Sequence, residues 1–340
     1  MFKLFRNQSK GRKILSAISM LAGCLLIGIF IYAGYLNNKV NAALAEISVS
    51  NGTNTNNITP DSPELAKTQE ADLANKPFTM LLTAVDRRKG SGGTMNTDVI
   101  MLVTINPITR AATVVSIPRD MEIEAAQLNH NTTHKANYFY AYFHNKDEDS
   151  AMLRTKQFFS EYFQIPIDYM AVINFDGFRQ LVDTMGGIEV DVDMDMRYVD
   201  KEDGTDINLK KGIQKLDGDK TLDFIRYRKS NRGTAESSDV ARNQRQQLVL
   251  DKLIGKMTSF KGVTGVGQLI EVVGESMSTD IPQATLKGYL LSFWKFIPET
   301  TEFINLVGEW ESPYIVVKAD ELERALEALR MRSKAPGIGK

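Results

Sequence analysis

The chain has 340 residues, with 41 lysines and arginines against 42 aspartates and glutamates, so its formal net charge is −1. A chain so close to neutral has no bulk attraction to nucleic acid or to acidic lipid, and any charge-based function has to be local. Because Cys24 is the only cysteine, disulfides within the chain and cysteine metal sites are excluded.

Residues 14–36 form an uncharged, mainly apolar run of 23 residues. At ~1.5 Å per residue this run is long enough to cross ~30 Å of hydrocarbon. The basic residues that precede it are Lys3, Arg6, Lys10, Arg12 and Lys13, whereas only Lys39 follows before Lys67. This bias predicts a cytoplasmic stub over residues 1–13, a transmembrane helix over residues 14–36 and an exported remainder.

Two alternatives to an uncleaved membrane anchor remain. A buried core helix is disfavoured because core helices alternate apolar and polar faces. A lipoprotein-like processing site, with Cys24 as the acylated residue, is suggested by the run from Leu21 to Cys24. It is disfavoured because the apolar run continues to Leu36, past the point at which cleavage is expected.

Beyond the anchor, residues 37–76 are rich in Asn, Thr, Ser and Pro and predict a flexible extracytoplasmic tether. We expect one domain over residues 77–332 and a flexible tail over 333–340. Short apolar runs predict strands covered on both faces at 78–85, 99–105, 112–117, 169–175 and 188–192. Helices are expected at 150–163, 176–185, 239–257, 284–296 and 319–330, the last with Asp320 as its N-cap. The fold class is therefore α/β, a three-layer α-β-α sandwich around a mixed sheet.

Two glycine-containing stretches are interpreted as structural. Gly186 and Gly187 end a predicted helix and turn the chain into a strand, which favours residues that tolerate a positive φ. Residues 195–215 are polar and punctuated by glycine, so they predict a long surface excursion or a small hairpin insertion.

Two constellations lie at predicted strand ends. Asp86 and Asp98 flank a glycine-rich loop that also carries Arg88 and Lys89. Two such carboxylates can share a hard divalent cation such as Mg²⁺, although an ordinary hairpin turn explains the pattern as well. Arg119 and Asp120 follow the third predicted strand, where α/β sheets usually place ligands, but they could equally form a salt-bridged loop.

The densest constellation starts at Arg226 and Arg228. In a strand these two side chains would share one face. On the following helix Asp239, Arg242 and Gln246 share another face, since they lie at i, i+3 and i+7. Several planar donors aimed at one place suit a pyrophosphate, although a solvated charged face remains the alternative. The acidic neighbours and the predicted export argue against nucleic acid as the partner.

Histidine provides little support for a zinc site. His130 and His134 are four residues apart, as a helical metal pair would be, but no glutamate completes a zinc-protease motif and only His144 remains elsewhere. Surface histidines are the simpler interpretation.

From about Phe78 to Leu329 the chain resembles the LytR-CpsA-Psr family of bacterial envelope proteins. The motifs that carry the resemblance occur in order: Asp86-x-Arg88, TDVIMLV at 97–103, SIPRD at 116–120, KAN at 135–137, NFDGFRQLVDTMGGIEV at 174–190, LDG…L…RYR at 216–228, and DxxRxxRQ at 239–246.

The resemblance implies a transferase of the bacterial cytoplasmic membrane that moves a glycopolymer from a polyprenyl-pyrophosphate carrier to a peptidoglycan sugar hydroxyl. It also implies an apolar tunnel for the prenyl chain between sheet and helices. By matching motif, Asp86 and Asp98 would hold Mg²⁺, with Mn²⁺ as the alternative. The residues expected to bind the pyrophosphate are Arg88, Arg119, Arg226, Arg228, Arg242 and Gln246. Those expected to be catalytic are Asp86, Arg119, Arg226, Arg228 and Asp239, with Asp86 or Asp239 as the general base.

One departure from the family pattern affects the expected site. Asn96 stands where the family commonly has an arginine two residues before the second aspartate. We hypothesise that Arg88 or Lys89 supplies the missing charge. The alternative function is a non-catalytic envelope or regulatory protein of the same fold that binds polyprenyl phosphates.

Overall fold

The computed structural model describes residues 76–85, 95–128, 132–201, 204–259, 277–291 and 296–334. The chain divides into two compact units, Met1–Ala43 and Leu44–Lys340, and all of the described residues lie in the second. The predicted stub, membrane helix and tether lie outside the described residues, apart from Lys76. Within the described ranges, no helix combines the length and the apolar character needed to span a bilayer.

A mixed sheet of six strands lies at the centre of the described residues, in the order β11-β6-β1-β2-β3-β12. The strands are β1 (Phe78–Val85), β2 (Thr97–Asn106), β3 (Ala111–Ser116), β6 (Tyr169–Asn174), β11 (Met277–Thr279) and β12 (Thr300–Asn305). β1 is antiparallel to β2 and parallel to β6, while β3 is antiparallel to β2 and parallel to β12. The predicted mixed central sheet is confirmed.

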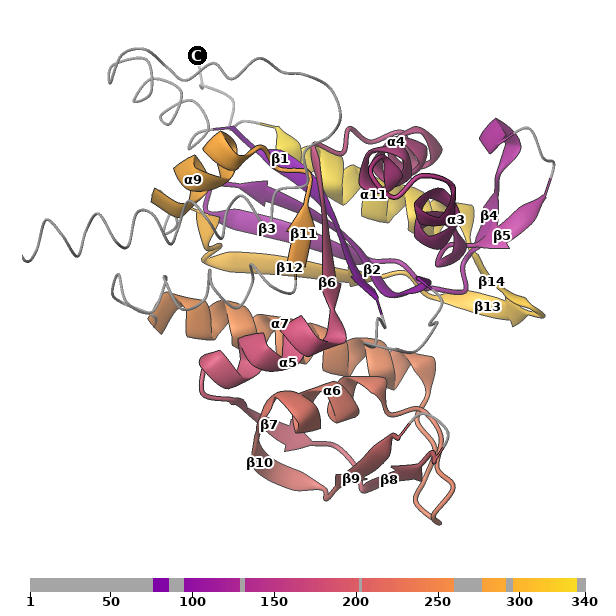
Figure 1. Cartoon of the computed structure of the whole chain (residues 1–340), viewed down its shortest axis with the longest axis vertical. Coiled ribbons are helices and arrows are strands. Elements are labelled where there is room, and N and C mark those ends of the chain that lie inside the picture. The colour runs from indigo at the N-terminus through magenta and orange to yellow at the C-terminus, as the bar shows by residue number, and fades with distance from the viewer. Residues whose placement is uncertain are drawn as a thin grey trace, which may run out of the picture. The chain divides into compact units, whose positions relative to one another are not determined.

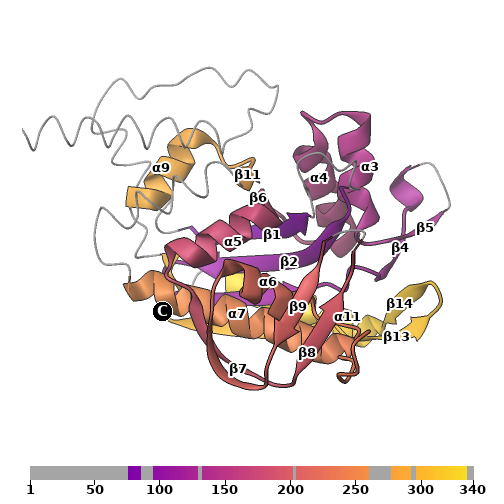
Figure 2. The same ribbon diagram turned by 60° about the horizontal axis from the view of Figure 1, so that its bottom comes forward.

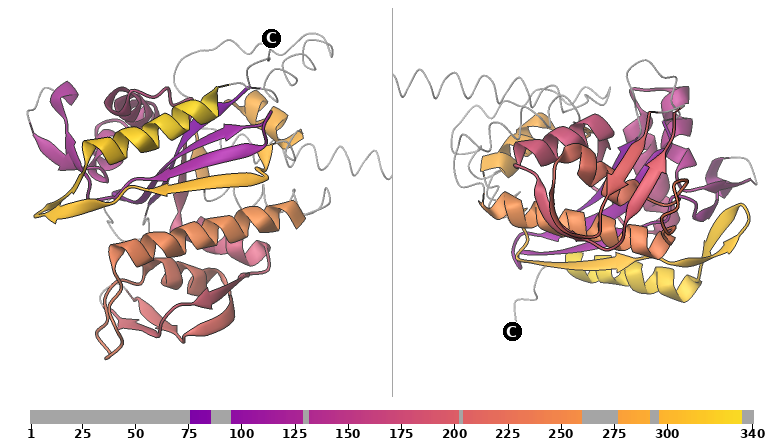
Figure 3. Two further views of the ribbon diagram at one scale, coloured as in Figure 1. Left: turned by 180° about the vertical axis from the view of Figure 1, so that it is seen from behind. Right: turned by 90° about the horizontal axis from the view of Figure 1, so that it is seen from below.

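Helices cover both faces of this sheet (Figures 1 and 3). On one face lie α3 (Tyr138–Lys146), α4 (Ala151–Phe163) and α11 (Ala319–Ser333); on the other lie α5 (Phe175–Thr184), α6 (Gly218–Arg226) and α7 (Asp239–Ser259). In the left view of Figure 3, the yellow α11 and the long orange α7 lie on opposite sides of the strands. α9 (Gln283–Leu291) corresponds to the first part of the helix predicted at 284–296.

Alternation along the strands divides the apolar residues between two cores. Leu81 and Val85 of β1 belong to a first core with α3, α4 and α11, while Ala84 belongs to a second core with α5, α6 and α7. Such two-sided burial explains why the central strands are apolar at nearly every position. β3, for example, is buried along its whole length.

The second core extends into a small β-layer beyond α6 and α7 (Figure 2). β7 (Ile188–Val192) pairs with β10 (Gly212–Leu216), and β8 (Met196–Val199) pairs with β9 (Asp206–Leu209). Of the two alternatives predicted for residues 195–215, the structure shows the hairpin, formed by β8 and β9. The prediction that β7 is covered on both faces is wrong. Its residues alternate strictly between buried and exposed, so only one face is covered. Gly186 and Gly187 both have φ of +75°, as the turn requires.

The remaining elements lie near the N-terminal end of β2. β4 (Glu122–Glu124) pairs with β5 (Thr133–Lys135), η1 (Ala126–Leu128) lies between them, and β13 (Gly308–Glu311) pairs with β14 (Tyr314–Val317). The predicted N-cap of α11 is wrong: Lys318 holds that position, and Asp320 lies in the first turn. A carboxylate there still interacts favourably with the positive end of the helix dipole.

Candidate functional site

A cavity of about 330 Å³ lies where β2 begins and β3 ends. Its walls come from β2, the loop after β3, the segment after α6, one face of α7 and the β13–β14 hairpin. The lining residues are Asp98, Val99, Ile100, Ser116, Ile117, Pro118, Arg119, Asp120, Arg228, Arg242, Asn243, Gln246, Leu306, Val307, Gly308, Trp310 and Ile315. Three arginines against two aspartates make this a cationic site with one apolar wall.

Sheet register brings Asp98 and Arg119 together. β2 and β3 are antiparallel, with Met101 opposite Ser116, and the Ile117 amide donates to the Ile100 carbonyl at 2.9 Å. The chain leaving β3 therefore runs beside the start of β2. Arg119 Nη1 lies 2.7 Å from Asp98 Oδ1, and both side chains are about one-third exposed (34% and 30%).

Asp120 and Lys135 extend this contact into a chain of alternating charges. Arg119 Nε lies 3.4 Å from Asp120 Oδ2, and Lys135 Nζ donates to Asp120 Oδ1 at 2.8 Å. Burial alone would lower the pKa of Arg119, but the two aspartates outweigh it and the pKa is raised. Burial alone would raise the pKa of Asp120, but Lys135 and Arg119 outweigh it and the pKa is lowered. Arg119 and Asp120 therefore both stay charged at neutral pH.

The α7 helix contributes one polar face to the cavity and a different face to the protein interior. Arg242, Asn243 and Gln246 line the cavity. Arg245, only 3% exposed, points elsewhere and binds Asp193 through two hydrogen bonds of 2.8 and 2.7 Å. The predicted grouping of Arg242 with Gln246 is confirmed. The side chain of Asp239, the third predicted member, lies outside what is described.

The segment that carries Arg228 is not the predicted strand. Arg226 is the last residue of α6, and Tyr227 follows it as the C-cap, fully buried. The helix begins after Asp217, whose side chain caps the N-terminus by accepting a hydrogen bond from the Lys220 amide. Arg226 consequently does not share a strand face with Arg228. Its guanidinium lies 5.0 Å from the centroid of the Phe175 ring, and it is not among the cavity-lining residues.

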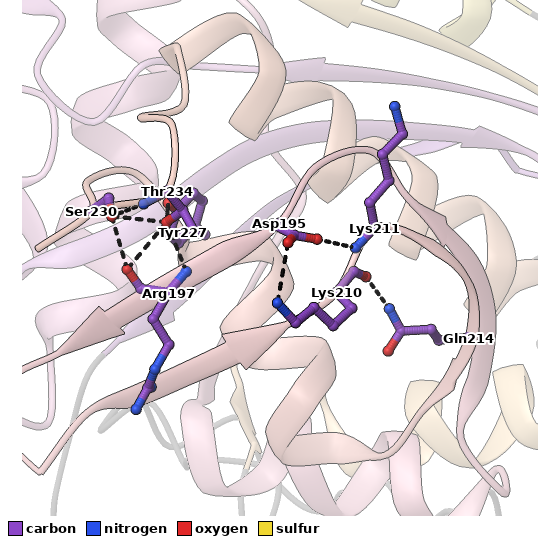
Figure 4. Close-up of polar contacts among 8 residues, drawn as sticks. All are labelled: Asp195, Arg197, Lys210, Lys211, Gln214, Tyr227, Ser230 and Thr234. Carbon is purple, nitrogen blue, oxygen red and sulfur yellow. Dashed lines mark hydrogen bonds and ion pairs between the residues drawn. The ribbon is translucent and has the colours of Figure 1, made fainter. Parts of the chain in front are cut away.

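Hydrogen bonds fix the course of the loop after Arg228 (Figure 4). The Tyr227 hydroxyl lies 2.8 Å from Thr234 Oγ1 and donates to the Ala235 carbonyl at 2.7 Å. Ser230 Oγ lies 2.8 Å from Thr234 Oγ1 and donates to the Arg197 carbonyl on β8 at 3.1 Å. Because these contacts anchor the loop to the β8–β9 hairpin, Arg228 is held at the cavity by a preorganised backbone.

Only part of the predicted metal site can be located. Asp98 is at the cavity, whereas Asp86, Arg88 and Lys89 lie outside the described residues. Within the described part of the chain no cluster of three or more His, Cys, Asp or Glu side chains could hold a metal ion. Mg²⁺ commonly binds through one or two carboxylates together with substrate phosphates and water. Asp98, beside the three arginines of the cavity, fits that mode.

The structure thus brings together five of the predicted residues, namely Asp98, Arg119, Arg228, Arg242 and Gln246. Sequence reasoning assigned no chemical role to Lys135, although this residue opens the KAN motif, and none to Trp310, which has no local signal. Zinc finds no support at His134, whose ring stacks on Tyr138 with centroids 4.1 Å apart. His144 lies 3.4 Å from Glu148, and His130 is outside the described residues.

Comparison with known proteins decides the family. The model of the LytR_cpsA_psr family matches residues 36–331. The chain belongs to this family. Its membership agrees with the ordered motifs, four of which contribute residues to the cavity: TDVIMLV, SIPRD, the motif that ends in RYR, and DxxRxxRQ.

Several relatives are teichoic acid transferases by name. A polyisoprenyl-teichoic acid–peptidoglycan teichoic acid transferase TagU from Halalkalibacterium halodurans is 27% identical over 327 residues, covering 94% of this chain and 98% of TagU. TagV of Bacillus subtilis is 29% identical over 272 residues, which cover 79% of this chain but only 65% of TagV. The crystal structure of B. subtilis TagV superposes with a TM-score of 0.61 at 25% identity, covering 77% of this chain and 99% of that one.

Proposed function

We propose that this protein is a membrane-anchored transferase that moves a glycopolymer from a polyprenyl-pyrophosphate carrier onto a sugar hydroxyl of peptidoglycan, forming a phosphodiester. The observation that carries the proposal is the convergence of Arg119, Arg228, Arg242 and Gln246 on one cavity. Arginine forks match phosphate oxygens in geometry and charge. The names of the TagU and TagV relatives support the same substrates.

The reaction balances as one displacement at phosphorus. The acceptor hydroxyl oxygen attacks the phosphorus next to the glycan, and the bond from that phosphorus to the bridging oxygen breaks. Polyprenyl monophosphate leaves with the bonding electron pair, and the acceptor proton passes to a base. Asp86 or Asp239 is the base we propose.

Catalysis of this kind depends on positioning and on stabilising negative charge. Arg228 and Arg242 approach the cavity from separate elements, so together they can hold both phosphates. Arg119 is oriented by Asp98 and Asp120, at 2.7 and 3.4 Å, and so has a fixed direction before the substrate arrives. When bound by Asp86 and Asp98, Mg²⁺ or Mn²⁺ would neutralise charge on the phosphate oxygens.

The proposed anchor is the helix over residues 14–36, with the N-terminus in the cytoplasm and the catalytic domain outside. A carrier whose tail lies in the bilayer presents its pyrophosphate at the membrane surface. A tethered enzyme meets that substrate at a higher effective concentration than a freely diffusing one would.

The test is reconstitution of the full chain in detergent with a synthetic polyprenyl-pyrophosphate glycan, Mg²⁺ and peptidoglycan fragments. Release of polyprenyl phosphate and a glycan-modified fragment are expected from the wild type. Both should fall at least 100-fold in Arg228→Ala. The matched control is Arg324→Ala, since Arg324 is 74% exposed on α11, away from the cavity.

A second candidate is a non-catalytic protein that binds polyprenyl phosphates. Asn96, which immediately precedes β2 and lies two residues before Asp98, favours it because the family's usual cation is absent at this position. The same assay separates the two candidates: lipid binding without release of polyprenyl phosphate supports the second. If the double variant Arg88→Ala, Lys89→Ala keeps full turnover, neither residue compensates for Asn96.

A further inference from the structure

Trp310 is a large apolar side chain in an unusual place. It lies on β13 opposite Ile315 of β14, it lines the cationic cavity, and 59% of its surface is exposed. Exposure of so large an aromatic side chain loses the free energy its burial would supply. An exposed tryptophan beside a cavity is therefore stronger evidence for a binding surface than an exposed small apolar residue elsewhere.

The hairpin that carries Trp310 is fixed to the cavity wall. The Ile315 amide donates to the Asp120 carbonyl at 2.8 Å, and the Tyr314 hydroxyl donates to the Thr133 carbonyl at 3.0 Å. At Gly308 a Cβ would lie 2.4 Å from the Val316 carbonyl oxygen, so the two strands meet there without room for a side chain. Trp310 is thus exposed on a rigid support, which lowers the entropic cost of binding a ligand against it.

Lys135 links the indole to the charged groups of the cavity. Its ammonium lies 5.8 Å from the centroid of the Trp310 ring and 2.8 Å from Asp120 Oδ1. Asp120 in turn contacts Arg119. An unbroken series of contacts therefore leads from the proposed phosphate site to an aromatic surface with a hydrogen-bond donor beside it.

We propose that Trp310 and Lys135 form a sugar subsite, in which the indole stacks on the pyranose ring that is attached to the pyrophosphate. This inference rests on the proposed function. A pyranose has a face of C–H groups with partial positive charge, which complements the negative face of an indole. Its hydroxyl groups at the ring edge can accept hydrogen bonds from the Lys135 ammonium.

The donor sugar fits this place better than the acceptor does. The prenyl end of the carrier needs the apolar wall, which Val99, Ile100 and Leu306 supply on the sheet side of the cavity. The glycan end then points to the exposed side, where Trp310 lies. Because the donor sugar is bonded directly to the phosphate, it must occupy the space beside the arginines whenever the donor is bound.

A membrane or protein contact at Trp310 is less consistent with its surroundings. Glu309 and Glu311, which flank it on the same strand, are exposed. They would be repelled by an anionic bilayer if the hairpin approached one. Among the described residues the other exposed large apolar side chains are Ile108, Ile213, Val307 and Met331, of which only Val307 also lines the cavity. Two residues do not make the extended apolar patch typical of a protein interface.

The test measures the affinity of the full chain in detergent for two probes, farnesyl pyrophosphate and the same lipid carrying one N-acetylglucosamine. In the wild type, the sugar should tighten binding by about tenfold, a gain of ~1.4 kcal/mol. Trp310→Ala should lose this gain and keep its affinity for the sugarless lipid, while Trp310→Phe should keep most of the gain. Ile213→Ala, at an exposed apolar residue of β10, is the matched control and should behave as wild type.

Intrinsic fluorescence gives a second measurement. The chain has two tryptophans, Trp294 and Trp310. In a Trp294→Phe background the emission should change on addition of the sugar-bearing probe and change much less with the sugarless one.

Four outcomes would overturn the inference. The first is a Trp310→Ala variant that keeps the sugar-dependent gain, and the second is one that weakens binding of both probes equally. The third is a Trp310→Ala variant that lowers affinity only for a soluble peptidoglycan fragment, because this would assign the indole to the acceptor. The fourth is a wild type that binds neither probe, which would refute the proposed function and the sugar subsite with it. In contrast, wild-type binding that is lost in Arg228→Ala supports the pyrophosphate site whatever happens at Trp310.

Discussion

Replacing Arg245 by alanine should destabilise the protein without acting directly at the cavity. The guanidinium, 3% exposed, makes two hydrogen bonds to Asp193 and one of 3.2 Å to the Tyr227 carbonyl. It also lies 5.6 Å from the centroid of the Phe224 ring. These contacts join α7 to the β7–β8 connection and to the residue before Arg228.

The expected loss of unfolding free energy depends on how exposed Asp193, the partner of Arg245, is to water. Breaking a buried ion pair costs ~3–5 kcal/mol, most of it from the charge left behind. Asp193 is 47% exposed, so water can solvate it and the cost lies at the lower end. We expect Arg245→Ala to lower the free energy of unfolding by about 3 kcal/mol, which corresponds to a decrease in Tm of roughly 6–12 °C.

Urea denaturation and calorimetry of the full chain in detergent measure this effect. Arg242→Ala is the matched control, because it removes an arginine three residues away that lines the cavity; its free energy of unfolding should change by less than ~1 kcal/mol. Arg245 holds the pKa of Asp193 below its usual value against the opposing effect of burial. The stabilisation is therefore present at neutral pH and is lost as pH falls through the folded-state pKa. A cost below 1 kcal/mol at pH 7 would refute this interpretation.

Four further substitutions test the fold and its charges. Gly187→Ala should lower the free energy of unfolding by ~3 kcal/mol, because an L-residue is strained at its positive φ and the Cβ would lie 2.5 Å from a backbone oxygen. Gly186→Ala has the same φ but nothing within 4 Å of the new Cβ, so it should lower the free energy of unfolding by only ~1 kcal/mol in the same urea titration. Asp120→Asn should lower the free energy of unfolding by ~1–2 kcal/mol, because Arg119 and Lys135 would then have only a neutral acceptor in place of the carboxylate. An unchanged urea midpoint would contradict the role of Asp120 as a bridge between these two cations. Asp223→Asn should raise thermal stability at pH 7.5, since burial raises the pKa of that carboxyl to about 6 and the folded state favours its protonated form. After discounting for solvent the gain is ~1 kcal/mol, and it should disappear as pH falls from 6 to 4, so an equal gain at pH 4 would argue against it.

Four of the six central strands, β1, β2, β3 and β6, and most helices could be predicted because apolar runs in a sequence indicate burial. The edge strands β11 and β12 were not predicted. β1 occupies the predicted residues 78–85, and α7 begins at the predicted Asp239. The motif residues also proved informative about the site. Asp98 lies on β2 and Arg119 in the loop that follows the adjacent antiparallel strand β3, and their side chains come within 2.7 Å.

Other features depend on tertiary context that a short pattern does not encode. The alternation around Arg226 and Arg228 looks like a strand over three residues, but the capped α6 helix continues to Arg226. Arg242 and Arg245 cannot be told apart by residue type. Only the packing of α7 places Arg242 at the cavity and Arg245 against Asp193. Trp310 has no local signal, because its importance comes from exposure beside groups far away in sequence.

The most direct measurement of the proposed chemistry is single-turnover transfer followed by ³¹P NMR of the synthetic glycan lipid with peptidoglycan fragments and Mg²⁺. The wild type should convert the pyrophosphate signals into one polyprenyl monophosphate and one phosphodiester signal. Asp98→Asn and Arg228→Ala should slow this conversion at least 100-fold, while Arg324→Ala should not. Bound lipid whose pyrophosphate signals persist in the wild type, or conversion that is equally fast in Arg228→Ala, would contradict a transferase centred on this cavity.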